Sequence, residues 1–275
     1  MSLNTVKILG VKINSSCKEE LLNKIVDFAS GKAGSSLVVF TPNPEFLVEA
    51  QKNKEFLQLL NCADLNLPDG VGLLWAGKIL GQEIKERVAG ADVVKEVLEI
   101  GNRLSGEILG KSDDFKIGQR ARRKQGEKGK GWVVGVMGAR RGVLFESAEL
   151  VKRLQQKYPH ISFVNLDDPS FLKIQYPVFN VIFACQGMKK QERWIWESKK
   201  RVPARVFMGV GGSLDFITGF SQRAPRWIRG MGLEWLWRGL QRPKHFQRIW
   251  KATVVFAWLV LREKFRSIRK GYFNL

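Results

Sequence analysis

Short β-rich runs alternate along this chain with longer stretches of helical periodicity, and this alternation restricts the fold more than any other feature. Strands that alternate with helices form a parallel sheet covered by helices. We therefore expect an α/β fold with a Rossmann-like parallel-sheet body, whose first helix begins at a capping box of Ser16 and Glu19. The β-rich runs are VKILGVKI, SLVVFT, WVVGVMG, ISFVN, NVIFACQG and RVFMGVGG, and the helical stretches are SSCKEELLNKIVDFASGK, PEFLVEAQKNKEFLQLL, residues 143–158 and a stretch from about Lys189.

Two segments depart from this alternation and suggest the organisation of the chain. Residues 110–131 are polar, basic and rich in glycine, which predicts a flexible surface insertion without a catalytic role. Residues 200–275 hold 16 Lys and Arg but only three acidic residues. We expect an α/β body over residues 1–200, and over residues 201–275 a last strand and glycine turn followed by a basic, mostly helical appendage.

The whole chain is basic, with 46 Lys and Arg against 26 Asp and Glu and a formal net charge of +20. Such a surface attracts nucleic acid, an anionic membrane face or a phosphorylated substrate, and charge alone does not choose among them. Cys17, Cys62 and Cys185 form no CxxC pair, which argues against a disulfide framework or a thiolate zinc site and fits a reducing cytoplasm. There is no signal-peptide pattern and no run of about 20 apolar residues, so neither secretion nor a membrane span is expected.

The basic C-terminal quarter also collects tryptophans, a combination that suits a membrane interface. The apolar run at residues 252–261, flanked by Lys251 and Arg262, is long enough to lie on a membrane but too short to cross it. One alternative is a helical hairpin whose tryptophans pack inward, and another is a nucleic-acid surface that stacks bases and contacts phosphates. Seven of the nine tryptophans of the chain lie in this quarter or just before it: Trp194, Trp196, Trp227, Trp235, Trp237, Trp250 and Trp258.

Polar side chains follow two of the expected strands where each one ends. Thr41 and Asn43 come after the run LVVF, and Asp69 stands in the triplet PDG. In an open α/β sheet, ligands bind beyond the carboxyl ends of the strands, so these three side chains are expected to face one cleft. The alternative is that PDG forms a tight turn in which the aspartate bonds only its own backbone.

Six stretches in chain order carry a resemblance to a known family: TPNPE, PDGVG, ERVAGAD, CQGMKKQERWI, MGVGGSLDFITG and SQRAPRWIRGMGLEWLWRGLQRPKHFQRIWK. Together they resemble the WecG/TagA/CpsF family of bacterial glycosyltransferases. The resemblance implies transfer of a sugar, N-acetylmannosamine-like or another hexose or uronic acid, from a UDP-sugar to an undecaprenyl-diphosphate-linked sugar, with inversion at the anomeric carbon. Such enzymes act in the synthesis of cell-surface polysaccharide or wall teichoic acid, at the cytoplasmic face of the membrane.

The chemistry that this resemblance implies can be assigned to particular residues. Asp69 is the expected general base that takes the proton of the acceptor hydroxyl, with Thr41 as a second catalytic residue. Asn43 and Arg87 are expected to bind substrate, and Arg87 is a candidate for the negative charge that grows on the leaving diphosphate.

Further substrate-binding residues are expected after later strands. Gln191 and Glu192 are assigned to the donor by resemblance, although an ordinary first helical turn would also place a glutamate there. Free N–H groups of a glycine-rich turn are expected to point at the diphosphate, unless the turn is only a close strand-to-helix connection. That turn comprises Gly209, Gly211, Gly212 and Ser213. Three arginines match the C-terminal arginines of the family and are expected to clamp the lipid diphosphate: Arg223, Arg226 and Arg238.

The sequence also leads to expectations about metals, cofactors, binding partners and cellular location. No D-x-D triplet occurs, so no divalent metal and no other cofactor is expected. The expected partners are a UDP-sugar, a polyprenyl-diphosphate-linked acceptor and the inner face of the cell membrane, where the protein is cytoplasmic and peripheral; an oligomer is compatible with the sequence and nucleic acid is not expected.

The resemblance has departures and a rival. Met188 stands where many relatives have proline, and NLDDPSF lacks the expected glycine-rich, aromatic ending, so the donor pocket is expected to differ. The rival interpretation is a basic nucleic-acid-binding protein without catalysis, which predicts strongly salt-dependent binding to DNA or RNA. A further alternative is a structural scaffold at the membrane surface.

Overall fold

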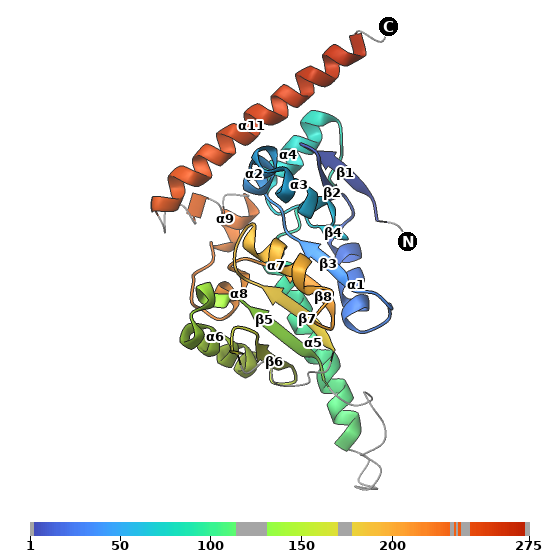
Figure 1. The fold of residues 1–275 in the computed structure, drawn as a ribbon, viewed down its shortest axis with the longest axis vertical. Coiled ribbons are helices and arrows are strands. Elements are labelled where there is room, and N and C mark those ends of the chain that lie inside the picture. The colour runs from blue at the N-terminus through green and yellow to red at the C-terminus, as the bar shows by residue number, and fades with distance from the viewer. Residues whose placement is uncertain are drawn as a thin grey trace.

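A six-stranded parallel sheet forms the centre of the molecule, which confirms the expected α/β class (Figure 1). The computed structural model describes residues 3–113, 131–169, 178–231, 234, 236, 237 and 243–272. The spatial order of the strands is β4-β3-β8-β7-β5-β6. Their bounds are β3 (Leu37–Phe40), β4 (Leu65–Asn66), β5 (Val133–Met137), β6 (Ser162–Asn165), β7 (Phe179–Ala184) and β8 (Ala204–Gly209).

The first β-rich run forms a separate antiparallel hairpin. β1 (Thr5–Ile8) pairs with β2 (Val11–Asn14), and Leu9 and Gly10 between them both have positive φ, 47° and 80°. Two successive left-handed residues match the right-handed twist of the flanking strands, which makes a two-residue hairpin loop favourable.

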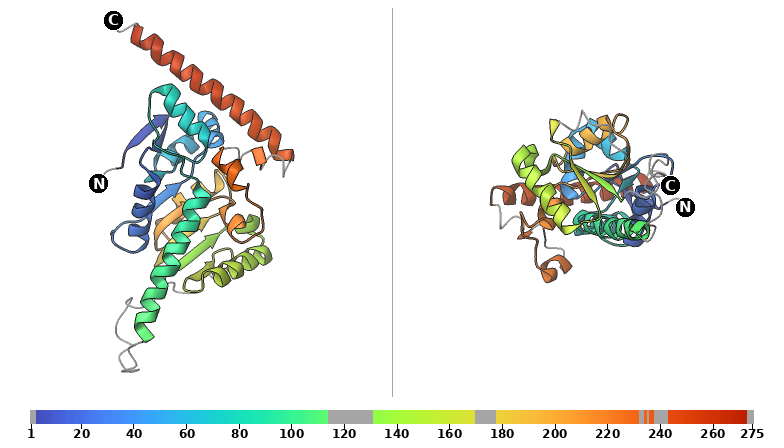
Figure 2. Two further views of the ribbon diagram at one scale, coloured as in Figure 1. Left: turned by 180° about the vertical axis from the view of Figure 1, so that it is seen from behind. Right: turned by 90° about the horizontal axis from the view of Figure 1, so that it is seen from below.

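Helices cover both faces of the sheet, and the buried side chains form two clusters, one on each face. In β8, Val206 and Met208 belong to the first cluster and Phe207 to the second, so the strand is apolar on both faces, as parallel strands between helix layers are. Figure 1 shows α7 in front of the sheet and Figure 2, from behind, shows α5 crossing the other face. The first cluster takes residues from α1 (Lys18–Ala29), α5 (Gly90–Asp113), α6 (Leu144–Lys157) and α8 (Ser213–Ile217), and the second from α2 (Pro44–Lys52), α3 (Lys54–Asn61), α4 (Val71–Leu80), α7 (Lys190–Ser198) and α11 (Pro243–Tyr272).

The first helix starts one residue later than its sequence signal indicates. The N-cap is Cys17, whose N–H donates to Glu20 Oε2 at 3.2 Å, so the predicted box of Ser16 and Glu19 is wrong. Because the N–H of Ser15 donates to Asn4 O at 2.9 Å, the hairpin pairing continues past β2 and delays the helix.

The predicted helical stretch after β3 is divided into α2 and α3. Asn53 ends the first helix and caps the second, since its Oδ1 accepts from Phe56 N at 3.0 Å. A cap satisfies N–H groups that have no partner within the helix, so the break is stable.

The predicted insertion begins inside a helix. α5 continues through Asp113, so residues 110–113 are helical, whereas residues 114–130 lie outside the described residues. That part of the prediction therefore has no structural counterpart to compare.

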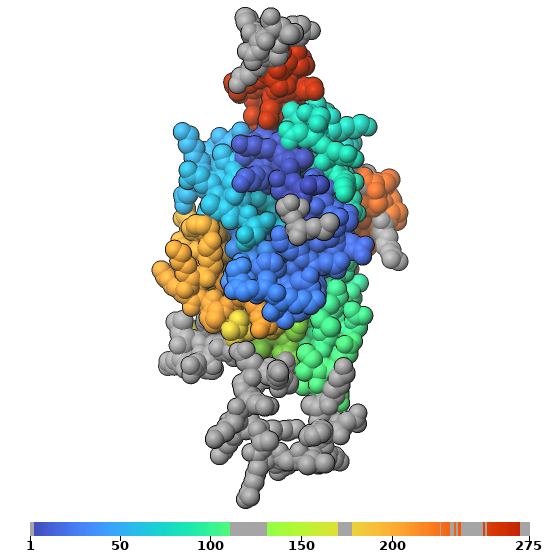
Figure 3. All heavy atoms as spheres, turned by 90° about the vertical axis from the view of Figure 1, so that its right-hand side faces the viewer, coloured from blue at the N-terminus to red at the C-terminus, as the bar shows by residue number. Residues whose placement is uncertain are grey.

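The long helix α11 packs across α2 and α4, and in Figure 3 its coloured part rises directly above α4. Its inward side buries Phe256 and Val260, and Glu263 Oε2 accepts from Leu9 N at 3.1 Å. Among the helices of the described residues, none combines the length and the apolar character that crossing a membrane requires.

Candidate functional site

All six strands end at the same edge of the sheet, and a cavity opens there beside β5 and β7. The chain leaves β5 towards β6 on one side and leaves β7 towards β8 on the other, which is the kind of switch point where open α/β sheets bind ligands. The cavity has a volume of about 360 Å³. It is lined by Ala139, Arg140, Arg141, Val143, Glu146, Leu150, Cys185, Gly211, Gly212, Leu214 and Asp215.

A strained turn after β5 forms one wall of this cavity. In η1 (Ala139–Gly142), Arg140 and Arg141 have φ values of 51° and 64°, and Gly138 and Gly142 on either side are left-handed as well. A left-handed conformation costs about 1–2 kcal/mol for a residue with a side chain, and such strain collects at functional sites. Sequence reasoning missed this turn, although a basic pair between two glycines directly after a buried strand is a visible signal.

The first arginine of the turn is fixed by two carboxylates. Arg140 Nε donates to Glu146 Oε2 at 2.9 Å, and its Nη1 lies 3.6 Å from Asp215 Oδ2. Its guanidinium also lies over the ring of Phe220, 4.6 Å from the centroid. Arg141, by contrast, is exposed and forms no ion pair with any residue in the described ranges.

Asp167 holds the same turn from the end of β6. Its Oδ1 accepts from Gly138 N at 2.8 Å, while its Oδ2 is buried and has no hydrogen-bond partner among the residues that the structure describes. Burial raises the pKa of Asp167, against the effect of the Gly138 hydrogen bond. Asp167 belongs to NLDDPSF, the stretch that departs from the family pattern, and through it this stretch stabilises the turn after β5.

The thiol of Cys185 follows β7 and lines the cavity. Burial raises the pKa of Cys185, and the nearby charges of Asp215 and Asp167 raise it further. The thiol therefore stays protonated and does not act as a nucleophilic thiolate.

Thr41 and Asn43 follow β3, and Asp69 follows β4, at the edge of the sheet where the strands end. The N–H of Asp69 donates to Pro42 O at 3.0 Å, which joins the two loops, and Asp69 is half-buried. Thr41 is buried and donates to Gly209 O at 3.2 Å, and Asn43 Oδ1 caps α2 by accepting from Phe46 N at 3.2 Å.

A glycine is required directly after Asp69. Gly70 has φ 120°, a conformation that side chains disfavour, and a Cβ there would lie 3.4 Å from Pro44 Cδ. The chain bends at Gly70, and the hydrogen bond from Asp69 N to Pro42 O holds Asp69 against the loop after β3.

Arg87 lies next to the Asp69 loop. The following residue, Val88, donates its N–H to Pro68 O at 2.9 Å. Arg87 is half-buried and has no ion-pair partner within the part of the chain that the structure describes. Its positive charge is thus not neutralised by a carboxylate of those residues.

Gln191 and Glu192 are buried, with exposed fractions of 1% and 0%, behind the glycine-rich turn. Gln191 Oε1 accepts from Gly211 N at 2.9 Å, and its Nε2 donates to Glu192 Oε1 at 2.6 Å. Glu192 Oε2 accepts from the N–H of Lys189, which has φ 72°, at 2.6 Å. Burial raises the pKa of Glu192 to about 7, although its hydrogen bonds act in the opposite direction.

The glycine-rich turn uses N–H groups that were expected to be free. Gly211 N donates to Gln191, and Ser213 donates to Val210 O through both its N–H and its hydroxyl, at 3.1 and 2.7 Å. The expectation of free donors is therefore wrong for these two residues. Gly209 lies against Gln191, since a Cβ there would be 3.0 Å from Nε2, and Gly212 lines the cavity.

Arg223 joins the C-terminal segment to α5. It binds Asp92 through two parallel contacts of 2.5 and 3.0 Å, and its Nε lies 3.4 Å from Glu234 Oε1. Burial opposes ionisation of Asp92, but the hydrogen bonds and charge of Arg223 lower the pKa of that carboxyl. This guanidinium is thus committed to carboxylates. Arg226 begins α9 (Arg226–Gly230), but its side chain and all of Arg238 lie outside the described residues.

The Asp69 loop and the cavity lie at the same edge of the sheet, but Thr41, Asn43, Asp69 and Arg87 are not among the residues that line the cavity. Four strand spacings of roughly 4.8 Å separate the ends of β4 and β5, or about 19 Å from the Asp69 loop to the turn of Arg140. Thr41 and Gly209 connect them through their hydrogen bond. In the described ranges, no group of three or more His, Cys, Asp or Glu residues is arranged to hold a metal ion.

Comparison with known proteins finds a family and relatives that match nearly the full length of the chain. The sequence model of the glycosyl transferase WecG/TagA/CpsF family matches residues 6–125 and 119–270. An N-acetylglucosaminyldiphosphoundecaprenol N-acetyl-beta-D-mannosaminyltransferase of Staphylococcus aureus strain MRSA252 is 29% identical over 279 residues, which cover 98% of this chain and 97% of that protein. The protein of the same name from strain MW2 is 29% identical over 277 residues, with the same shares covered.

Proposed function

The chain belongs to the WecG/TagA/CpsF family of glycosyl transferases, and from this premise we propose that it transfers a sugar from a UDP-sugar to an undecaprenyl-diphosphate-linked sugar, with inversion. The proposed sugar is N-acetylmannosamine-like, as the names of the relatives suggest, or another hexose or uronic acid. The observation that carries the proposal is the shared edge of the sheet, where the Asp69 cluster and the cavity lie on one side of the molecule.

The proposed reaction is a direct displacement. The acceptor oxygen attacks C1 of the donor sugar, a new C1–O bond forms on the opposite face, and the bond from C1 to the diphosphate oxygen breaks. Asp69 takes the proton of the acceptor hydroxyl, and the leaving diphosphate takes the electron pair. Thr41 and Asn43 hold the reacting groups beside Asp69, and Arg87 supplies a positive charge near it.

The donor occupies the cavity in this proposal. Gln191 positions the glycine-rich turn by accepting from Gly211, and Glu192 holds Gln191 in place. We assign both residues to positioning because they are buried behind the turn. Ser213 and Gly209 belong to the same support, whereas Gly212 faces the donor.

The lipid-linked acceptor lies in a membrane, so the enzyme needs a surface that binds to the membrane, and α11 provides such a surface. Its outer side carries large apolar residues spaced three or four apart, interleaved with arginines. A helix of this kind lies in the interface with its apolar side chains among lipids and its cations at headgroups. We propose peripheral binding at the inner face of the membrane. This outer stripe comprises Trp250, Val254, Trp258, Leu261, Phe265 and Ile268.

The experiment is sugar transfer from a panel of UDP-sugars to a short-chain polyprenyl-diphosphate-GlcNAc acceptor, for the wild type and for Asp69→Asn. Loss of a positioned general base typically costs about a hundredfold to ten-thousandfold in rate. A surface control, Asp27→Asn, keeps full activity because that carboxylate pairs with Lys32 on the surface. Equal rates for wild type and Asp69→Asn would remove Asp69 from the mechanism.

The same assay tests two further parts of the proposal. We expect activity to survive EDTA, since the chain has no D-x-D motif, and collapse under EDTA with recovery on adding magnesium or manganese would contradict this. No transfer from any UDP-sugar, together with tight and salt-sensitive binding of DNA or RNA, would favour the nucleic-acid alternative.

A further inference from the structure

The leaving diphosphate needs a cation within the donor cavity, and two arginines line that cavity. Arg140 is already neutralised, since it pairs with Glu146 and lies 3.6 Å from Asp215. The N–H groups of Gly211 and Ser213 are occupied by protein acceptors. Among the cavity-lining residues, this leaves Arg141 as a cation without a carboxylate partner in the described parts of the chain.

The backbone at Arg141 is held in a conformation that its side chain disfavours. Its φ is 64°, a value at which glycine or asparagine is favoured. The turn is fixed on both sides, by the contacts of Arg140 with Glu146 and by the hydrogen bond from Gly138 N to Asp167 Oδ1. Within the described ranges, the Arg141 side chain has no hydrogen bond, ion pair or cation-π contact that would offset this strain. Backbone strain that no interaction within the protein offsets is expected at a site where a bound ligand supplies that interaction.

We propose that Arg141 binds the diphosphate of the nucleotide donor and of the nucleotide product, an inference that rests on the proposed function. The guanidinium presents a planar set of N–H donors that matches two phosphate oxygens. It pairs with the charge of the diphosphate oxygens, and no bond is made or broken and no proton is transferred at Arg141 itself. Arg87, beside Asp69, lies at the other end of the site.

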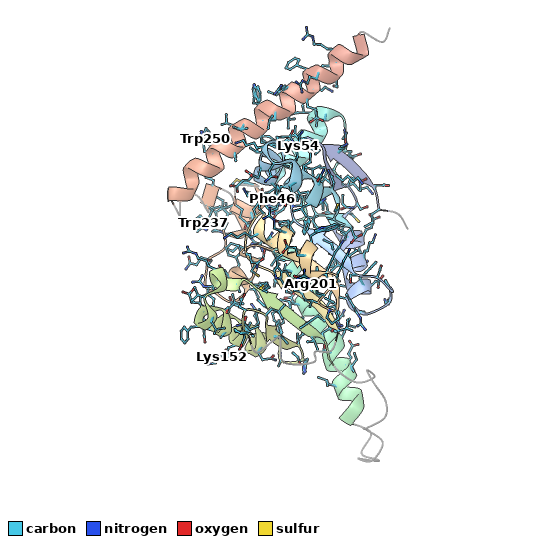
Figure 4. The ribbon with its side chains drawn as sticks, viewed as in Figure 1. Phe46, Lys54, Lys152, Arg201, Trp237 and Trp250 are labelled. Atoms are coloured by element: carbon cyan, nitrogen blue, oxygen red, sulfur yellow. The ribbon has the colours of Figure 1, made fainter. Side chains whose placement is uncertain are left out.

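Calorimetric titration of the full chain with UDP, UMP and uridine tests this inference. Arg141→Gln should weaken UDP binding by about 10- to 100-fold, the effect of losing hydrogen bonds to a charged group. Uridine, which has no phosphate, should bind the variant as it binds the wild type. Arg201→Gln is the matched control, because Arg201 is exposed in the turn before β8, at the opposite edge of the sheet from the cavity (Figure 4).

A second variant separates ligand binding from folding. Arg141→Gly removes the cation and also relieves the left-handed strain, so it should fold at least as stably as the wild type and still bind UDP weakly. Unchanged UDP affinity in both Arg141 variants would overturn the inference while leaving the proposed function intact. Equal losses for UDP and uridine would also overturn it, because the side chain would then contact the nucleoside. A wild type that neither binds UDP nor transfers sugar would overturn the proposed function itself.

Discussion

Backbone strain is concentrated near the cavity. Of the four non-glycine residues with positive φ in the described ranges, Arg140 and Arg141 form the turn after β5 and Lys189 precedes α7, whereas Leu9 lies in the hairpin. Lys189 is stabilised by Glu192, which accepts from its N–H, and Glu192 in turn holds Gln191 against Gly211. A buried carboxylate with a raised pKa therefore connects a strained residue to the wall of the cavity.

Glu192 should make stability depend on pH. Its pKa rises from 4.5 to about 7 on folding, so the folded protein binds this proton more tightly than the unfolded chain does. Stability then falls as pH increases from about 4.5 to about 7, by something on the order of 3 kcal/mol, and stays lower above that range. In Glu192→Gln this group cannot ionise, so it adds no pH dependence to stability. The free energy of unfolding of the wild type minus that of the variant should therefore be smaller at pH 8 than at pH 5.

Urea unfolding at the two pH values measures this difference. The amide cannot accept hydrogen bonds from both Lys189 and Gln191, so the variant is expected to be less stable than the wild type at pH 5. Its transfer rate should fall as well, because the glycine-rich turn loses its support. A difference in stability that is the same at pH 5 and pH 8 would show that Glu192 does not titrate in this range.

At the scale of the element, α11 has two sides with different roles. Phe256 and Val260 pack towards α2 and α4, while the outer stripe faces away, as Trp250 does in Figure 4. The sequence alone left the tail as an inward-packed hairpin, a nucleic-acid surface or a membrane surface. The buried and exposed sides of one helix show that some large apolar residues do pack inward, and that others remain for a partner.

Two neighbouring aromatic residues of α11 allow a matched comparison. Phe256 has an exposed fraction of 5% and Trp258 of 57%. Phe256→Ser should lower the free energy of unfolding by several kcal/mol, roughly the 3–5 kcal/mol typical for loss of a buried aromatic side chain. Trp258→Ser should leave stability almost unchanged but weaken binding to lipid vesicles. Thermal unfolding and vesicle sedimentation measure the two effects, and the same result for both variants would show that α11 has no distinct inner and outer sides.

At the scale of the whole molecule, charge is distributed unevenly. Most of the net charge of +20 lies in the last quarter of the chain, where exposed arginines flank the outer stripe of α11. The ion pairs of Arg223 with Asp92, and the contact of Glu263 with Leu9, connect this basic segment to the body. Deletion of the segment would expose the apolar surface of α2 and α4, so charge substitutions test its role more directly.

Binding to anionic vesicles should depend on these arginines. Replacing Arg262, Arg266 and Arg269 with Gln should weaken binding markedly, since each cation near an anionic surface contributes about 1 kcal/mol. The wild-type interaction should also weaken as salt increases, and it should be much weaker with neutral vesicles. The control replaces three exposed cations of the body, Arg103, Lys152 and Lys200, with Gln. Equal losses in both triple variants would indicate a non-specific effect of net charge.

The local pattern of the sequence determined the sheet and the strand ends. The runs that form β3, β7 and β8 became central strands because their apolar residues on both faces are buried between helix layers, whereas the first run became a separate hairpin. Thr41, Asn43 and Asp69 could be grouped in advance because parallel strands end at one edge, so residues after different strands meet there. The start of α1 and the division between α2 and α3 were less predictable, since each depends on a single hydrogen bond.

Only the tertiary structure decided how the polar residues are used. Arg223 matched the family pattern for a lipid-binding arginine, but its partner Asp92 lies 131 positions away, and no local pattern reports that pairing. Gln191 and Glu192 match a family motif and were expected to bind the donor, yet the packing of α7 against β7 and β8 buries them behind the glycine-rich turn. Arg140 and Arg141 look alike in sequence, but Glu146 and Asp215 neutralise only the first. Local sequence determines which conformations a segment favours, whereas the charge available to a ligand depends on which distant side chains the fold brings into contact.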